Sequence, residues 1–222
     1  MTPVFRSGDI ALWHGDALEI LERALADLQP SVVLVDPPYG ITYPGGHLDA
    51  RKLAAAIAND EDLVVRDRVL AWAAHRSVPV ACFGSWRRPT PKGTRARLVW
   101  DKGPCAGMGN LALPWKDSAE EIFILGRGWA GHRGEGVLRV PVAHAGSVGR
   151  YHPHEKPVAL LVEILRKAPA GLVLDPCCGS GSTLLAARLL GRPAVGIELD
   201  ERWIRVARER IAQGWLFTGA VA

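Results

Sequence analysis

Short apolar runs alternate with segments of helical periodicity along the whole chain. The first helical segment repeats leucine every three or four residues from Leu18 to Leu28. The same criteria predict strands at 9–13, 31–35, 78–83, 97–100, 121–125, 171–174 and 194–197, and helices at 17–28, 61–76, 182–190, from Pro157, and from Asp200 to Gly214. This alternation is typical of a mostly parallel sheet covered by helices on both faces. We therefore expect a doubly wound α/β fold, in which the fourth and fifth strands form an antiparallel edge hairpin.

The composition is that of one soluble globular domain spanning residues 1–222. Hydrophobic residues make up 48% and charged residues 23% of the chain, which has a mass of 24.0 kDa and a mean hydropathy of +0.07. A chain of this size and composition buries a sizeable core, which excludes a disordered regulator. No apolar run approaches the roughly 20 residues that cross a bilayer, and residues 1–9 contain no apolar signal core. We expect a cytoplasmic protein with no membrane partner.

Charge and cysteine usage narrow the functional classes further. Lys and Arg total 27 against 23 Asp and Glu, and the net charge of +4 permits a polyanionic partner without requiring one. The four cysteines contain no Cys-x-x-Cys pair, so neither a disulfide framework nor a structural zinc site is indicated. His152 and His154 have no third ligand at a suitable spacing. We expect a protein without a metal.

The segment Asp36-Pro37-Pro38-Tyr39 directly follows a β-branched run and is the first candidate for chemistry. A buried strand that ends in Asp brings a carboxylate to the carboxyl edge of the sheet, where open α/β folds bind ligands. Proline has no N–H, so Pro37 and Pro38 leave only acceptors beside that carboxylate, and the Tyr39 ring can stack on a planar group. Such a site fits a conjugated exocyclic amine. The alternative is an ordinary turn, because Asp and Pro favour turns in any protein.

A second candidate site follows a predicted strand in the last third of the chain. Asp175 precedes a turn with Gly179 and Gly181 and then a helix, so a ligand can approach the backbone near a helix N-terminus. A dinucleotide fingerprint is excluded because Leu184 occupies the third glycine position, and a P-loop is excluded because no Gly-Lys-Ser/Thr follows. A nucleoside ligand with little or no phosphate remains. Glu198, about 20 residues after the first glycine, can accept both ribose hydroxyls, although taken alone it fits a solvated charge as well.

Together these motifs resemble the DNA amino-methyltransferases that use S-adenosylmethionine, in the circularly permuted β-type group whose catalytic motif precedes the cofactor motif. The resemblance covers most of the chain and rests on five motifs in order, at 14–16, 36–39, 152–157, 175–183 and 195–200. It implies a seven-stranded Rossmann-like methyltransferase sheet and the catalytic residues Asp36, Pro37, Pro38 and Tyr39. It assigns to the cofactor Asp16, Lys156, Asp175, Cys177, Gly179, Gly181, Thr183 and Glu198.

Some of these assignments have a second interpretation or depart from the family pattern. Asp16 and Glu19 have the spacing of a capping box, which explains Asp16 without a ligand. Lys156 also fits a solvated charge before a helix. Cys177 stands where the family usually has Phe, and His154 where a small hydroxyl residue is usual. Neither change removes a reacting group.

The resemblance implies direct methyl transfer from S-adenosylmethionine to an exocyclic amine of DNA. Hydrogen bonds from the amine to Asp36 and the Pro37 carbonyl would draw its nitrogen toward tetrahedral geometry, and the base, flipped out of the duplex, would stack on Tyr39. Asp-Pro-Pro-Tyr accompanies adenine more often than cytosine in the family, so N6 of adenine is favoured over N4 of cytosine. An amino group of RNA and a non-catalytic nucleic-acid-binding protein are further alternatives, the latter disfavoured by the intact Asp36 and Tyr39.

Two segments rich in glycine, proline and basic residues are candidates for contact with double-stranded DNA. Residues 85–97 form a predicted loop beside the carboxyl end of a strand, with Arg87, Arg88, Lys92 and Arg95 placed to bind phosphates. Residues 126–150 lie where the family places target recognition and contain Arg127, His132, Arg133, Arg139, His144 and Arg150. Because this segment is short, either it reads few base pairs or a second subunit of a homodimer supplies contacts. Restriction and modification is the expected context.

Overall fold

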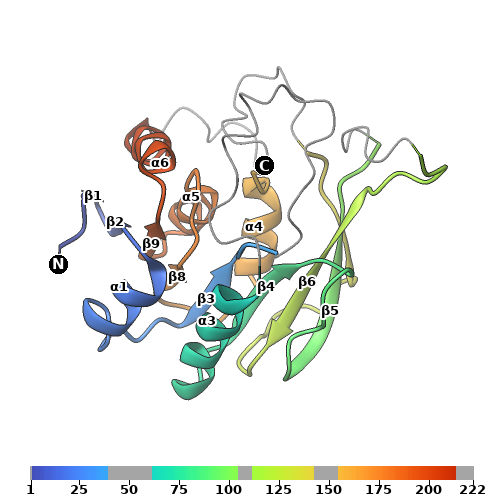
Figure 1. The fold of residues 1–222 in the computed structure, drawn as a ribbon, viewed down its shortest axis with the longest axis horizontal. Helices are drawn as coiled ribbons and strands as arrows, with labels where there is room; N and C mark the ends of the chain where they lie inside the picture. The colour runs from blue at the N-terminus through green and yellow to red at the C-terminus, as the bar shows by residue number, and fades with distance from the viewer. Residues whose placement is uncertain (1, 40–61, 105–111, 143–154, 214–222) are drawn as a thin grey trace.

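The computed structural model describes residues 2–39, 62–104, 112–142 and 155–213, which form a mixed sheet with helices on both faces (Figure 1). The strands in this part of the chain are β1 Phe5–Ser7, β2 Ile10–His14, β3 Val32–Val35, β4 Val80–Gly84, β5 Thr94–Asp101, β6 Ala119–Leu125, β7 Val137–Arg139, β8 Val173–Asp175 and β9 Ala194–Glu198. Their spatial order is β1-β2-β9-β8-β3-β4-β6-β5-β7. Only β1 and β6 run antiparallel to their neighbours.

Helices pack on both faces of this sheet and divide its core in two. The helices in the described ranges are α1 Ala17–Arg23, α3 Val64–His75, α4 Val158–Leu165, α5 Ser182–Leu189 and α6 Glu201–Gln213. In β3, Val32 and Leu34 join the core under α4, α5 and α6, whereas Val33 and Val35 join the core under α1 and α3. Because both faces of β3 are covered, its sequence is a continuous apolar run. None of these helices has the length and apolar character to cross a membrane.

The doubly wound α/β fold and the antiparallel pairing of β5 with β6 are confirmed. The expected number of seven strands is wrong, since the described residues form nine. The additional edge strands β1 and β7 have three residues each, too few to give a recognisable periodicity. β7 pairs with the outer side of β5, so the antiparallel pair lies one strand inside the edge. The first helix ends at Arg23 rather than Leu28, and Gly214, expected to end the last helix, lies outside the described residues.

The carboxyl ends of the parallel strands meet at one side of the sheet, which we call the carboxyl edge. Asp36 follows β3, Asp175 ends β8 and Glu198 ends β9, so three carboxylates lie on three neighbouring strands. β6 runs in the opposite direction and therefore begins at this edge, where Glu121 lies opposite Gly84, the last residue of β4. The edge thus combines the ends of parallel strands with the start of an antiparallel one.

Candidate active site

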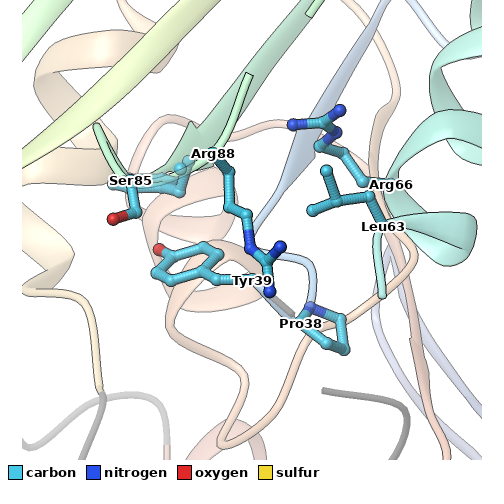
Figure 2. Close-up of a pocket in the computed structure, with 8 residues that line it drawn as sticks. Pro38, Tyr39, Leu63, Arg66, Ser85 and Arg88 are labelled. Carbon is cyan, nitrogen blue, oxygen red and sulfur yellow. The ribbon is translucent and has the colours of Figure 1, made fainter. Parts of the chain in front are cut away.

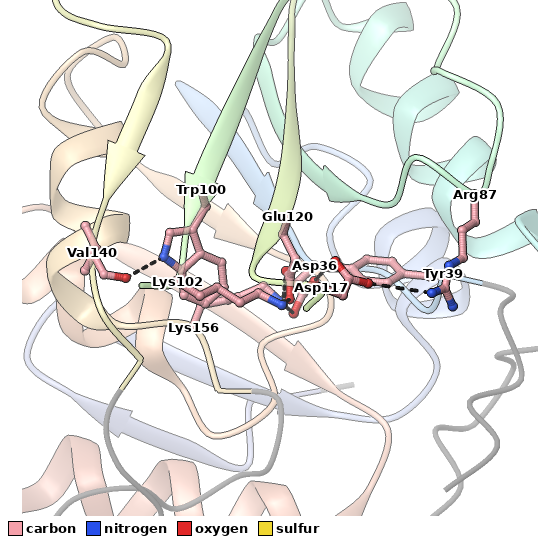
Figure 3. Close-up of polar contacts among 9 residues, drawn as sticks. All are labelled: Asp36, Tyr39, Arg87, Trp100, Lys102, Asp117, Glu120, Val140 and Lys156. Atoms are coloured by element: carbon pink, nitrogen blue, oxygen red, sulfur yellow. Dashed lines mark hydrogen bonds and ion pairs between the residues drawn. The ribbon is translucent and has the colours of Figure 1, made fainter. Parts of the chain in front are cut away.

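Asp36 is held at the carboxyl edge by two polar partners (Figure 3). Its Oδ1 accepts a hydrogen bond of 2.6 Å from the Tyr39 hydroxyl, and its Oδ2 accepts one of 2.7 Å from the Lys156 ammonium. The Asp36 side chain is still 28% exposed. Pro37 and Pro38 have no N–H that could compete for these oxygens. The carboxylate is therefore fixed in direction yet reachable from solvent, and its oxygens keep lone pairs for a further donor.

Lys156 lies buried between two carboxylates. Its side chain is 7% exposed, and its Nζ lies 3.1 Å from Glu120 Oε2. The same Nζ lies over the rings of Phe83 and Tyr39, 5.0 and 5.6 Å from their centroids. Burial alone would lower the pKa of this ammonium, but Asp36 and Glu120 outweigh burial and raise the pKa to about 12. The structure thus places Lys156 with the Asp36 carboxylate, and its contact with a cofactor stays a prediction.

Glu120 and Lys102 complete this cluster and were not expected from the sequence. Glu120 Oε1 lies 2.7 Å from Lys102 Nζ, and Glu120 Oε2 lies 3.3 Å from the Tyr39 hydroxyl. Burial would raise the pKa of Glu120, but Lys156 and Lys102 together lower it below its ordinary value. No local motif contains either residue. The sequence shows only that both charges lie just outside predicted strands, Lys102 after 97–100 and Glu120 before 121–125. The pairing of β5, β6 and β4 brings them close to Asp36.

A small hollow adjoins Pro38 and Tyr39 (Figure 2). The Arg88 side chain extends from the segment after β4 toward these two residues. Arg66 also lines the hollow, but it is buried and donates a hydrogen bond of 2.9 Å to the Pro89 carbonyl, which ties α3 to the segment after β4. The Arg66 hydrogen bond therefore holds one side of the hollow in place, and the Arg88 guanidinium lies beside the Asp36 motif.

Asp175 lies buried at the end of β8. Its Oδ1 accepts the Cys177 N–H at 3.0 Å, and the Thr183 side chain bonds to the same carboxyl group. Burial raises the pKa of Asp175 to about 7, against the lowering effect of these two hydrogen bonds, and the charges of Asp36 and Glu198 add to the rise. A perturbed acid beside a turn is typical of a ligand site, since a cationic ligand would favour its ionised form.

Glu198 fixes the glycine turn from the neighbouring strand. Its Oε2 accepts the Gly179 N–H and its Oε1 accepts the Asp200 N–H, both at 2.8 Å. Burial raises the pKa of Glu198 above its ordinary value. Gly179 has a φ of +50°, and a Cβ there would meet nothing within 4 Å. The turn therefore borders open space beside a carboxylate.

Gly181 and Cys177 shape this turn without offering a reactive group. Gly181 has a φ of +82°, and a Cβ there would lie 3.2 Å from the Cβ of Ala207 in α6. Burial raises the pKa of the Cys177 thiol well above its ordinary value, so the thiol stays protonated at neutral pH. Cys177 packs at the rim of the core under α1 and α3. It is thus an apolar neighbour of the turn rather than a nucleophile.

Asp16 caps α1, as the alternative interpretation of its motif predicted. Its Oδ1 accepts the Glu19 N–H at 2.9 Å. The Gly15 N–H donates to the Glu198 carbonyl at 3.0 Å, so the cap lies beside the end of β9. Contact between Asp16 and a cofactor stays a prediction. Within the described ranges no cluster of His, Cys, Asp or Glu could hold a metal ion.

Comparison with known proteins identifies the family of this chain. A family model described as DNA methylase, N6_N4_Mtase, matches residues 86–209. The chain belongs to the N6/N4 DNA methylase family. Type II methyltransferase M.ScaI of Streptomyces caespitosus is 40% identical over 264 aligned positions, covering 94% of this chain and 83% of that protein. YubD of Escherichia coli (strain K12) is 46% identical over 68 residues, which are 30% of each chain.

Solved structures share the fold at low sequence identity. The M1.HpyAVI–SAM complex has a TM-score of 0.68 at 21% identity and covers 91% of this chain and 98% of its own. The PvuII DNA methyltransferase, which is cytosine-N4-specific, has a TM-score of 0.62 at 14% identity and covers 96% and 93%. At these identities the likeness establishes the fold of this DNA methylase and leaves its target base open.

For a DNA methylase the position of basic side chains relative to the carboxyl edge matters, and the structure divides the predicted set. Arg87 and Arg88 follow the end of β4 and lie at this edge. Arg87 lies over the Trp86 ring, 5.3 Å from its centroid, and 3.6 Å from Asp117. Both arginines are thus on the side of the sheet that carries Asp36.

Lys92 and Arg95 lie toward the opposite edge of the sheet. β5 begins at Thr94, so the expected loop 85–97 is shorter than predicted. Thr94 pairs with the last residue of β6, which also pairs with the first residue of β4. The structure therefore does not bring Lys92 and Arg95 to Asp36, because the chain crosses the sheet between Arg88 and Thr94.

The predicted recognition segment 126–150 also begins at the opposite edge. It follows the end of β6, and Ala130 donates a hydrogen bond to the carbonyl of Lys167, just beyond α4. β7 then returns to the carboxyl edge, where Arg139 lies opposite Asp101. The basic residues before β7, namely Arg127, His132 and Arg133, are therefore far from Asp36 along the strand direction. His144 and Arg150 lie outside the described residues.

Proposed function

We propose that this DNA methylase transfers a methyl group from S-adenosylmethionine to N6 of adenine in duplex DNA. The observation that carries the proposal is the Asp36 carboxylate, which Tyr39 and Lys156 hold in one direction while its side chain stays partly exposed. The similarity to a type II methyltransferase supports a role in restriction and modification.

The residues around the glycine turn fit a nucleoside that carries a cationic amino acid. Glu198 would accept the ribose hydroxyls, and Asp175, with a pKa of about 7, would favour a positive charge beside it. The open space beside Gly179 leaves room for the nucleoside to approach the backbone closely. S-adenosylmethionine, bound there, would supply an activated methyl group, because its sulfonium gives up the methyl carbon and leaves as a neutral thioether.

In this proposal Asp36 and the Pro37 carbonyl bind the amine that receives the methyl group. The exocyclic amine of a base is a poor nucleophile, since its lone pair is delocalised into the ring. When Asp36 and Pro37 each accept one N–H of the amine, its nitrogen is drawn toward tetrahedral geometry, and the lone pair becomes localised on the nitrogen. Asp36 is then the nearest base for the proton that the nitrogen loses.

Tyr39 has two tasks in this proposal. Its hydroxyl fixes Asp36, and this bond in turn orients the ring. The target base has to leave the duplex, because its amine is paired there, and the Tyr39 ring offers it a stacking surface. Arg88, which adjoins the same hollow, is placed to bind a phosphate beside the extruded nucleotide.

N4 of cytosine is the second candidate acceptor. Two fixed acceptors bind the amino group of cytosine as well as that of adenine, so the described contacts do not discriminate between the bases. Adenine comes first because Asp-Pro-Pro-Tyr accompanies adenine more often in the resembling group.

The experiment compares the wild-type protein with Asp36→Ala on unmethylated duplex DNA and on RNA. After incubation with labelled S-adenosylmethionine, the nucleic acid is digested to nucleosides and analysed by mass spectrometry. We expect N6-methyladenine from DNA, and a rate at least about 100-fold lower for the variant, with cofactor affinity within about threefold of wild type. Detection of N4-methylcytosine instead would identify cytosine as the target base. Label confined to RNA would refute the DNA assignment. Retained turnover by Asp36→Ala would show that another group binds the amine.

A further inference from the structure

Glu120 belongs to no motif, yet it lies at the centre of an alternating row of charges. The row runs from Asp36 to Lys156, from Lys156 to Glu120, and from Glu120 to Lys102, with nitrogen–oxygen distances of 2.7, 3.1 and 2.7 Å. Figure 3 shows the Lys156 ammonium beside the Asp36 and Glu120 carboxylates, and Lys102 is paired with Glu120. The row has no net charge. Its two central members come from other parts of the chain than Asp36, because Glu120 lies in β6 and Lys156 precedes α4.

We propose that Glu120 is a positioning residue for methyl transfer, which acts by sharing the Lys156 ammonium with Asp36. The proposal rests on the function proposed above, since it concerns how Asp36 receives the amine. Lys156 is too buried for water to solvate its charge fully. Among the residues that the structure describes, Asp36 and Glu120 are the carboxylates paired with this ammonium, so without the Glu120 charge it would be held by Asp36 alone.

The shared ammonium leaves Asp36 free to act as an acceptor. An ammonium held by Asp36 alone draws electron density from that carboxylate and competes with the amine for its oxygens. Glu120 gives Lys156 a second partner at 3.1 Å, close enough for the ammonium to move toward it when an amine binds Asp36. The Tyr39 hydroxyl contacts the same two carboxylates, at 2.6 Å from Asp36 and 3.3 Å from Glu120, and so fixes their relative positions.

The charge of Glu120 also favours the transition state. As the new bond to the amine nitrogen forms, positive charge develops on that nitrogen beside Asp36. The positive charge of Lys156 opposes this development, and the negative charge of Glu120 cancels most of that opposition in a site of low dielectric constant. Removal of the Glu120 charge should therefore slow the chemical step rather than weaken the binding of either substrate.

The test is Glu120→Gln, which keeps the shape of the side chain and removes its charge. We expect kcat to fall about tenfold, while the KM for DNA and the dissociation constant for S-adenosylmethionine stay within about twofold. Glu120→Asp, which restores a carboxylate, should recover part of the loss. The matched control is Glu121→Gln, because Glu121 is the next residue of β6 and pairs with Arg97 rather than Lys156. The control should have the kcat of the wild-type protein.

A second measurement follows the Lys156 ammonium directly. In nitrogen-resolved NMR of the protein without DNA, a buried lysine ammonium gives a signal that exchanges slowly with water, assigned by its loss in Lys156→Met. This signal should shift in Glu120→Gln and stay unchanged in Glu121→Gln.

An unchanged kcat or an unshifted signal in Glu120→Gln overturns the proposal. A fall in kcat matched by equal losses of melting temperature and cofactor affinity also overturns it, since that pattern is structural. Failure of the wild-type protein to methylate DNA refutes the proposed function instead.

Discussion

At the scale of single residues, burial changes the protonation of Asp175 beside the glycine turn. Its pKa of about 7 in the folded protein lies far above the ordinary value of 3.8, chiefly because the carboxyl is removed from water. The folded state thus binds this proton more tightly than the unfolded chain, so the contribution of Asp175 to stability falls as the pH rises from about 4 to about 7. A cationic ligand that favours the ionised form reverses part of this cost.

The affinity for S-adenosylmethionine should therefore rise with pH through about 7. At pH 6 most of the Asp175 carboxyl is protonated, and binding has to release that proton, whereas at pH 8 the group is already ionised. Relative to Asp175→Asn, the wild-type protein should bind about tenfold more weakly at pH 6 than at pH 8. Isothermal titration calorimetry at several pH values measures this ratio. An identical pH dependence in the two proteins would place the cationic part of the cofactor away from Asp175.

At the scale of elements, one buried arginine of α6 supports the glycine turn. Arg210 donates hydrogen bonds of 2.8 Å to the carbonyl and hydroxyl of Ser180, and its other amino group lies 2.5 Å from Glu155. Arg210 is buried on the same helix face as Ile204, Ala207 and Ile211. It therefore links α6 to the turn before α5 and to the segment before α4.

Arg210→Met should loosen this brace. The substitution removes the ion pair with Glu155 and the two hydrogen bonds to Ser180, which together should cost about 3 kcal/mol of the free energy of unfolding. Cofactor affinity should fall with it, because the glycine turn loses its support. The control Arg205→Met removes an exposed arginine from the same helix and should change stability by no more than about 0.5 kcal/mol. Urea unfolding measures both values, and equal small losses would show that Arg210 does not support the turn.

The contrast between β3 and β6 explains which parts of the fold could be predicted from the sequence. β3 is buried on both faces, so its apolar run and the Asp36 that follows it are visible in the sequence. The same holds for Asp175 and Glu198, because parallel strands bring their ends to one edge. Glu120 was missed because it comes close to Asp36 only through the pairing of β6 with β4, whereas the sequence predicts only the pairing of β6 with β5.

At the scale of the whole molecule, the reversed direction of β6 decides which basic residues can meet DNA. The sequence predicts four basic residues on one loop, because residues 85–97 are expected to lie at a single end of the sheet. The register instead puts Arg87 and Arg88 at the carboxyl edge and Lys92 and Arg95 toward the other. A duplex bound over Asp36 would therefore lie beside the first pair and away from the second.

DNA binding should separate these two pairs. The double variants Arg87→Ala/Arg88→Ala and Lys92→Ala/Arg95→Ala lose the same formal charge, so a difference between them reports position rather than net charge. We expect the first to weaken binding to every duplex alike, at least about tenfold at low salt, and to reduce the dependence of log K on log salt by up to about 2. The second should differ little from wild type. Fluorescence anisotropy over a series of salt concentrations measures both quantities. Equal losses in the two variants would mean that the overall electrostatic field of the protein, and not the carboxyl edge, holds the duplex. A change in sequence preference alone would instead assign Arg87 and Arg88 to base readout.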